Sequence, residues 1–170
     1  MYLRIIGAML IVAASGGFGF SMAVQFNRSH RAFRQLLLSM DTMLCDLQYR
    51  LSPLHVLCRE AAKIAEGSVR KLFLNLSKEL ERQIAPDVYQ CMCAAIQVTD
   101  NLPAAILPHL KQLGKSMGQY DLEGQVRMME AAKLSCIRAI EHMETNKEHQ
   151  LRSYQTLSLC AGAALAVLLF

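Results

Sequence analysis

The sequence predicts an all-α protein: an antiparallel bundle of about six helices, with a transmembrane helix at each end of the chain. Three observations support this fold class. Apolar residues recur three and four positions apart along most of the chain, the period of helices with one buried face. No alternation with the period of a strand stands out, and long uncharged stretches lie at both termini. We therefore divide the chain into an N-terminal transmembrane helix (1–27), a helical-bundle domain (28–152) and a C-terminal transmembrane helix (153–170).

The N-terminal segment carries no charged residue between Arg4 and Arg28. About 23 uncharged residues can cross the hydrocarbon core of a bilayer, and they exceed the apolar core of a typical signal peptide. A retained transmembrane helix is therefore expected in preference to a cleaved signal peptide. A basic cluster, Arg28, Arg31 and Arg34, follows the segment. The positive-inside rule then places the bundle in the cytoplasm and the basic cluster at the anionic membrane surface.

The residues that follow are predicted to form a long helix that reaches Leu51. Its apolar positions are spaced four, three, four, three and four residues apart, a heptad-like stripe that indicates one buried seam. The stripe comprises Phe33, Leu37, Met40, Leu44, Leu47 and Leu51. Because it covers only about three heptads, packing within the same chain is expected rather than an extended coiled coil.

Proline, glycine and cap residues divide the middle of the chain into shorter helices. Ser52 as a cap and Pro53 at the first helical position start a helix that stops at Gly67. Further helices are expected to begin near Ser68, at Pro86-Asp87 and at Pro103. Pro108 would fall in the second turn of the last of these, so a kink or a delayed start is expected there.

The stretch LGKSMGQYDLEGQ (113–125) closes one helix and opens the last one. Gly118 suits the left-handed position just past a helix end, and Asp121 is placed to cap the next helix. With Gly114 and Gln125, these two residues form the structural motif that we expect to fix this turn.

A single helix is predicted from Leu122 to the end of the chain, because no proline interrupts it. Its length would be about 70 Å at 1.5 Å per residue. The last ~18 residues, after Arg152, are uncharged and leave no polar face for water. A second transmembrane helix is therefore expected rather than a buried terminal helix of the bundle.

No group of residues in this sequence makes a convincing catalytic, cofactor or metal site, so we do not expect an enzyme. The glycines lack the context of a phosphate loop, and His142 and His149 lie seven positions apart, too far for an ordinary pair of metal ligands on a helix. The six cysteines lack the spacing of a disulfide or zinc scaffold, so free core thiols are expected. A net charge of only +4 and the absence of a dense basic face argue against a nucleic-acid partner.

Five segments taken in order resemble the stage III sporulation protein AB family of endospore-forming bacteria. They are the glycine-rich N-terminal segment, FRQLLLSMDTMLCDLQYRLSPL through Ser52-Pro53-Leu54, LFLNLSKEL (72–80), LGKSMGQYDLEGQ (113–125) and SYQTLSLCAGAALAVLLF (153–170). The most specific is LGKSMGQYDLEGQ, through the spacing of its glycines, Asp121 and Gln125. The resemblance spans nearly the whole chain.

This resemblance implies a two-pass component of the mother-cell-to-forespore secretion apparatus, in the mother-cell membrane that faces the forespore. The bundle is similar to the cytoplasmic domains of inner-membrane platform proteins of type II secretion. By that analogy it would dock a cytoplasmic ATPase and pack against sibling membrane subunits, and a homo-oligomer is compatible with this role. The alternative is a membrane-anchored helical sensor module. Such a receptor needs an output domain after its second membrane helix, and this chain ends at Phe170.

Overall fold

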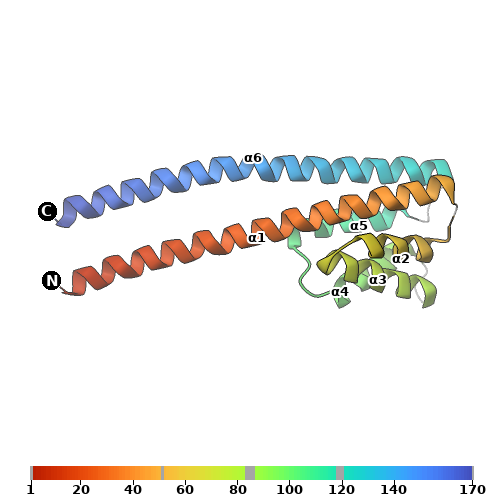
Figure 1. Cartoon of the computed structure of the whole chain (residues 1–170), viewed down its shortest axis with the longest axis horizontal. Helices are drawn as coiled ribbons and strands as arrows, with labels where there is room; N and C mark the ends of the chain where they lie inside the picture. Colours follow the sequence, from red (N-terminus) through yellow and green to blue (C-terminus); the bar gives the residue numbers. More distant parts are fainter. Residues whose placement is uncertain (1, 51, 83–86, 118–120, 170) are drawn as a thin grey trace. The chain divides into compact units, whose positions relative to one another are not determined.

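The computed structural model describes residues 2–50, 52–82, 87–117 and 121–169, and within them the side chains of residues 24–145. This part of the chain is helical and contains no strand, which confirms the all-α fold class (Figure 1). In chain order the elements are α1 (Tyr2–Tyr49), α2 (Leu54–Ile64), α3 (Gly67–Arg82), α4 (Val88–Val98), the 3₁₀ helix η1 (Ala104–Ile106), α5 (Leu107–Ser116) and α6 (Leu122–Leu169).

The chain divides into two compact units. One comprises Met1–Asn27 and Glu141–Phe170, and the other comprises Arg28–Ile140 and is called the bundle below. Among the residues whose side chains are described, no helical stretch combines the length and the apolarity needed to cross a bilayer. The expected transmembrane segments 1–27 and 153–170 lie almost entirely outside those residues. Both segments and their boundaries therefore stay predictions.

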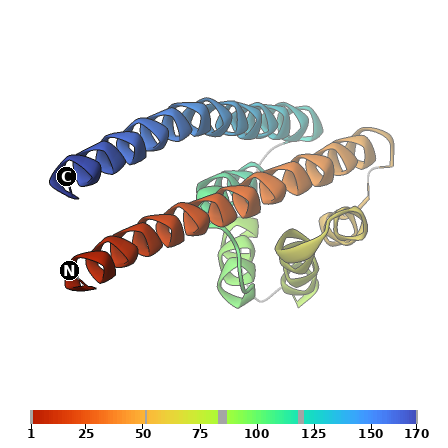
Figure 2. The same cartoon turned by 60° about the vertical axis from the view of Figure 1, so that its left-hand side comes forward.

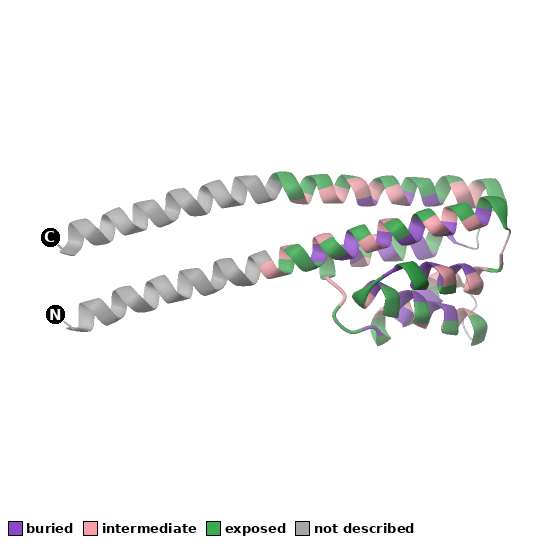
Figure 3. Ribbon diagram, in the orientation of Figure 1, coloured by how far each residue is buried: buried purple, intermediate pink, exposed green. Residues whose placement is uncertain are grey.

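In the bundle, the short helices α2 to α5 gather beside the C-terminal half of α1 (Figures 1 and 2). The core is almost entirely apolar, and purple buried positions recur along the bundle part of every helix in Figure 3. Among the described residues, no buried side-chain nitrogen or oxygen lacks a hydrogen-bond partner. Burial of the apolar faces therefore leaves no unpaired side-chain polar atom inside.

The buried stripe of α1 differs in part from the predicted one. Phe33, Met40 and Leu47 are buried as expected, but Leu36 and Met43 fill the core in place of Leu37 and Leu44. The spacing of four and three residues is the same in both stripes, so hydrophobic period alone cannot separate them. The packing of α1 buries Leu36, three positions after Phe33, rather than Leu37, four positions after it.

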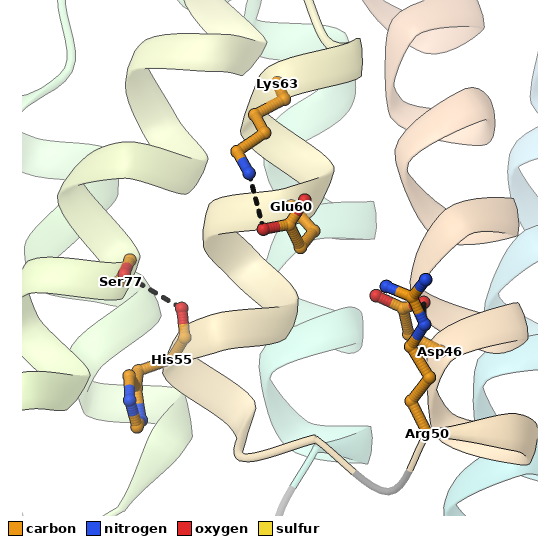
Figure 4. A network of polar contacts seen from close by, with 6 residues as sticks. All are labelled: Asp46, Arg50, His55, Glu60, Lys63 and Ser77. Atoms are coloured by element: carbon orange, nitrogen blue, oxygen red, sulfur yellow. Dashed lines mark hydrogen bonds and ion pairs between the residues drawn. The ribbon is translucent and has the colours of Figure 1, made fainter.

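The start of α2 also differs from the prediction. Pro53, with φ −56° and ψ 147°, occupies the cap position instead of the first helical position, and this helix start has no side-chain cap hydrogen bond. Ser52 therefore lies outside the cap. A neighbouring helix also contacts this first turn, because the buried Ser77 hydroxyl on α3 donates to the carbonyl of His55 at 2.9 Å (Figure 4).

Backbone geometry explains where the next helices begin and end. Gly67 has φ +61°, a conformation that side-chain-bearing residues rarely adopt, and it opens α3 directly after the end of α2. The C-terminus of α4 is tied to α3 by Asn75, whose side-chain amide donates to the Thr99 hydroxyl at 3.0 Å. Pro108 lies in the first turn of α5, after η1, which confirms the delayed helix start.

The turn before α6 is described on both sides of residues 118–120. Asp121 caps α6 as predicted, since its carboxylate accepts the Gly124 backbone N–H at 3.1 Å, and its carbonyl accepts the Gln125 N–H at 2.8 Å. The prediction for Gly118 lies outside the described residues. The single long helix is confirmed, because α6 contains 48 residues and is about 72 Å long.

Candidate interaction surfaces

One polar and aromatic junction joins α1, α5 and α6 within the bundle. The ring of His109 on α5 meets Phe33 of α1 edge to face, with centroids 5.2 Å apart and planes at 73°. Its Nδ1 lies 3.2 Å from the hydroxyl of Ser135 on α6. Asp41 of α1 and Lys133 of α6 form an ion pair between the same two long helices. These contacts therefore connect α1, near the start of the chain, with the last two helices, α5 and α6.

The Ser135–His109 pair resembles the nucleophile and the base of a catalytic serine site, but it lacks the third group that orients the base. A catalytic serine needs its base to be oriented by a third group, usually a carboxylate. Among the described residues, His109 has no carboxylate partner, and its ring contacts the apolar Phe33 instead. This geometry supports packing of helices and not acyl transfer.

Lowering the pH below about 6.5 is expected to destabilise the bundle through His109. Partial burial lowers the pKa of His109 from its ordinary value of 6.5. The folded state therefore keeps the ring neutral over a pH range in which the unfolded chain already binds a proton, and the free energy of unfolding falls as the pH drops through that range. Urea unfolding followed by circular dichroism at pH 7.5 and pH 5.5 measures the loss. In His109→Gln the loss should be smaller, and an unchanged loss would contradict this assignment.

Gly114 of the LGKSMGQYDLEGQ motif lies where α5 packs closely against α4. A methyl group at this position would lie 2.8 Å from Met92 Cβ and 3.5 Å from Tyr89 Cα, so only glycine allows the two helices this separation. The adjacent Lys115 ammonium lies 5.2 Å from the centroid of the Tyr89 ring, a cation–π distance. Gly114 belongs to the motif that the sequence predicts. No sequence pattern indicates that Met92 is the residue that Gly114 contacts.

The basic cluster is divided by the structure. Arg28 and Arg31 line a cleft of about 340 Å³, and Arg34, one turn further along α1, does not. The other walls come from the junction between α2 and α3 and from the loop between α4 and η1. Their residues are Glu66, Gly67, Ser68, Val69, Asn101 and Pro103. Sequence reasoning missed these residues, because nothing in the pattern links three segments so far apart.

A second cleft of about 340 Å³ lies between the end of α1 and the start of α6. It is lined by Gln48, Leu122, Glu123, Val126 and Arg127. Large exposed apolar side chains are scattered over five helices rather than gathered in one patch, which is ordinary for a protein surface. They are Leu38, Tyr49, Ile64, Leu74, Val98, Leu122, Met128 and Leu134.

The described cysteines are free thiols, three of them in the core. Cys58, Cys91 and Cys136 are buried, whereas Cys45 is exposed on α1, so the expectation of a core thiol was wrong for Cys45. Burial raises the pKa of Cys58 to about 12, so the thiol stays protonated and unreactive at neutral pH. Cys160 lies outside the residues with described side chains. Within those residues, no group of three or more histidine, cysteine or acidic side chains is placed to hold a metal ion.

Comparisons with known proteins identify the family. The family model described as Stage III sporulation protein AB matches residues 4–170. Stage III sporulation protein AB of Bacillus subtilis (strain 168) is 25% identical over 169 residues, which cover 98% of this chain and 99% of that protein. A solved structure of Stage III sporulation protein AB (SpoIIIAB) has the same fold, with a TM-score of 0.61 and 21% identity over 72% of this chain and 98% of that one. The chain therefore belongs to the stage III sporulation protein AB family.

Proposed function

We propose that this protein is a non-enzymatic membrane platform component of a secretion channel that crosses the two membranes around the forespore. Family membership supports a role in sporulation. In this proposal the bundle lies in the cytoplasm of the mother cell, docks a cytoplasmic ATPase and packs against sibling membrane subunits. The two termini anchor it in the membrane that faces the forespore.

The observation that carries this proposal is the continuity of α1 and α6. Each contains 48 residues, and each runs without a break between the packed bundle and a long uncharged segment, 5–27 in α1 and 153–169 in α6. A helix transmits displacement along its axis better than a flexible linker, because every backbone group is hydrogen-bonded to the next turn. Force applied to the bundle by an ATPase would therefore reach the membrane through two rigid elements.

The polar ties within the bundle suit the same role. Asp41–Lys133 and Ser135–His109 hold α6 to α1 and α5, and Arg59 of α2 pairs with Glu81 of α3. These contacts add polar bonds to the apolar packing between the helices. The helices of the bundle would then resist being pulled apart when an ATPase applies force to them.

Thiol labelling of intact bacterial cells that produce the chain tests the topology. Lys78, exposed on α3, is changed to cysteine in a Cys45→Ser background, and the same background without Lys78→Cys is the control. A membrane-impermeant maleimide should leave the engineered cysteine unlabelled until the cells are permeabilised. A cysteine at Tyr2, on the predicted outer side, should react in intact cells. Labelling at position 78 from outside would overturn the cytoplasmic location and with it the docking of an ATPase.

A further inference from the structure

We propose that the cleft beside Arg28 and Arg31 binds the phosphate headgroup of an anionic phospholipid. The inference rests on the membrane anchorage proposed above, and it names a ligand for one surface of the bundle. The cleft is formed by three segments, the start of the bundle part of α1, the α2–α3 junction and the α4–η1 loop. Its volume of about 340 Å³ is within the range of sites for small molecules.

The rim of the cleft offers cationic and donor groups that the protein itself does not use. Arg28 and Arg31 are exposed, and among the described residues neither has an ion-pair or hydrogen-bond partner. The first residues of α3, Gly67 and Ser68, also line the cleft, and backbone N–H groups at a helix start have no partner within the helix. Two guanidinium groups next to such donors match the oxygens of a phosphate.

The walls favour a lipid over a free anion. Ala32 and Val69 line the cleft and are buried, and Pro103 adds a further apolar contact. A site that combines cations with apolar groups suits an amphiphile, whose phosphate pairs with arginine while its glycerol and first methylene groups contact the apolar lining. Arg28 also directly follows the segment 1–27 in sequence, so this residue would lie near the lipid headgroups of the proposed membrane.

The architecture holds the two sides of the cleft together. Gln35, one turn after Arg31 on α1, accepts the backbone N–H of Glu66 through its side-chain oxygen at 3.1 Å. This bond fixes the α2–α3 junction against the helix that carries the arginines. Glu66 also lines the cleft, and its carboxylate opposes binding of an anion. Removing that negative charge should therefore strengthen binding of the lipid, whereas removing a positive charge from the cleft should weaken it.

The test measures lipid binding by the full chain in an uncharged detergent, using native mass spectrometry with phosphatidylglycerol and with zwitterionic phosphatidylcholine. The wild-type chain should retain phosphatidylglycerol preferentially. Arg31→Gln should weaken its binding about 5–10-fold, and Glu66→Gln should strengthen it about 2–5-fold. Arg34→Gln is the matched control: it removes the same charge from the same helix one turn away but outside the cleft, so its effect should be less than about twofold.

Three outcomes would overturn the proposal. Equal losses of phosphatidylglycerol binding in Arg31→Gln and Arg34→Gln would mean that the lipid is attracted to the positive surface in general and that the cleft is not a specific site. Binding of inorganic phosphate with no preference among lipids would exclude a lipid as the ligand. Displacement of the lipid by hexaglutamate, without a difference between the two lipids, would reassign the cleft to an acidic protein segment. Sedimentation of the chain with membranes under alkaline wash tests the anchorage separately, so failure of the cleft leaves the proposed function standing.

Discussion

Replacing Leu36 by alanine is expected to lower the free energy of unfolding of the bundle by about 2–5 kcal/mol. Leu36 is 0% exposed, on the face of α1 that contains Phe33 and Met40. Truncation removes apolar surface from the core and leaves a cavity that rigid helices fill only in part. The next two residues, Leu37 and Leu38, provide matched controls, because the three leucines are consecutive on one helix but differ in burial.

The three alanine variants should rank by burial. Leu38 is 49% exposed, so Leu38→Ala should change the free energy of unfolding by no more than about 0.5 kcal/mol, and Leu37→Ala should fall between the other two. The rate at which a maleimide labels Cys58 reports opening of the bundle, since this thiol is buried. Labelling is followed at Cys58 itself by peptide mass spectrometry, because Cys45 is exposed and reacts in the folded state. A larger loss for Leu37→Ala than for Leu36→Ala would restore the stripe that the sequence predicts and contradict the observed packing.

The comparison of these leucines shows why the positions of the helices could be predicted from the sequence, whereas the face of α1 that is buried could not. Helix boundaries follow largely from local chemistry, and the prolines, Gly67 and Asp121 mark them in the sequence to within about four residues. The buried face of α1 depends on which neighbours α1 meets. Three leucines in a row satisfy either heptad register, so only tertiary packing decides between Leu36 and Leu37.

The start of α2 shows the same limit on a smaller scale. A serine followed by proline is a strong local signal for a cap, yet Pro53 takes the cap position and the first turn is contacted by Ser77 from another helix. That hydroxyl lies 22 residues away from His55 in sequence, so no local pattern reveals it. The observed cap therefore lies one residue after the predicted one, and this shift leaves the order of helices unchanged.

The candidate surfaces were predictable only as single residues. The basic cluster was visible as charge, but its division into Arg31 inside a cleft and Arg34 outside it depends on segments near Glu66 and Asn101. Similarly, Gly114 was recognised as part of a motif, while the reason for a glycine is the side chain of Met92 on α4 opposite it, above all its Cβ. Spacing in sequence identifies residues with special roles, but it does not identify their partners in space.

Replacing Gly114 by valine is expected to lower the free energy of unfolding by about 2–3 kcal/mol, through overpacking between α5 and α4. The added Cβ alone would lie 2.8 Å from Met92 Cβ, closer than such atoms approach in folded proteins. Met92 cannot relieve the clash by changing rotamer, because its Cβ is fixed by the backbone of α4. The two helices must therefore separate, which also disturbs the contact between Lys115 and Tyr89.

The control for Gly114→Val is Lys111→Val, which places the same side chain on the exposed face of α5. This change costs only the difference in helix propensity, about 0.5 kcal/mol. Gly114→Ala should fall between the two variants, because alanine gains up to about 1 kcal/mol in helix propensity and creates a smaller clash. Urea unfolding of the full chain in detergent, with Cys58 labelling as the readout, measures all three. Equal stability of Gly114→Val and the wild-type chain would mean that α4 and α5 do not meet at Gly114.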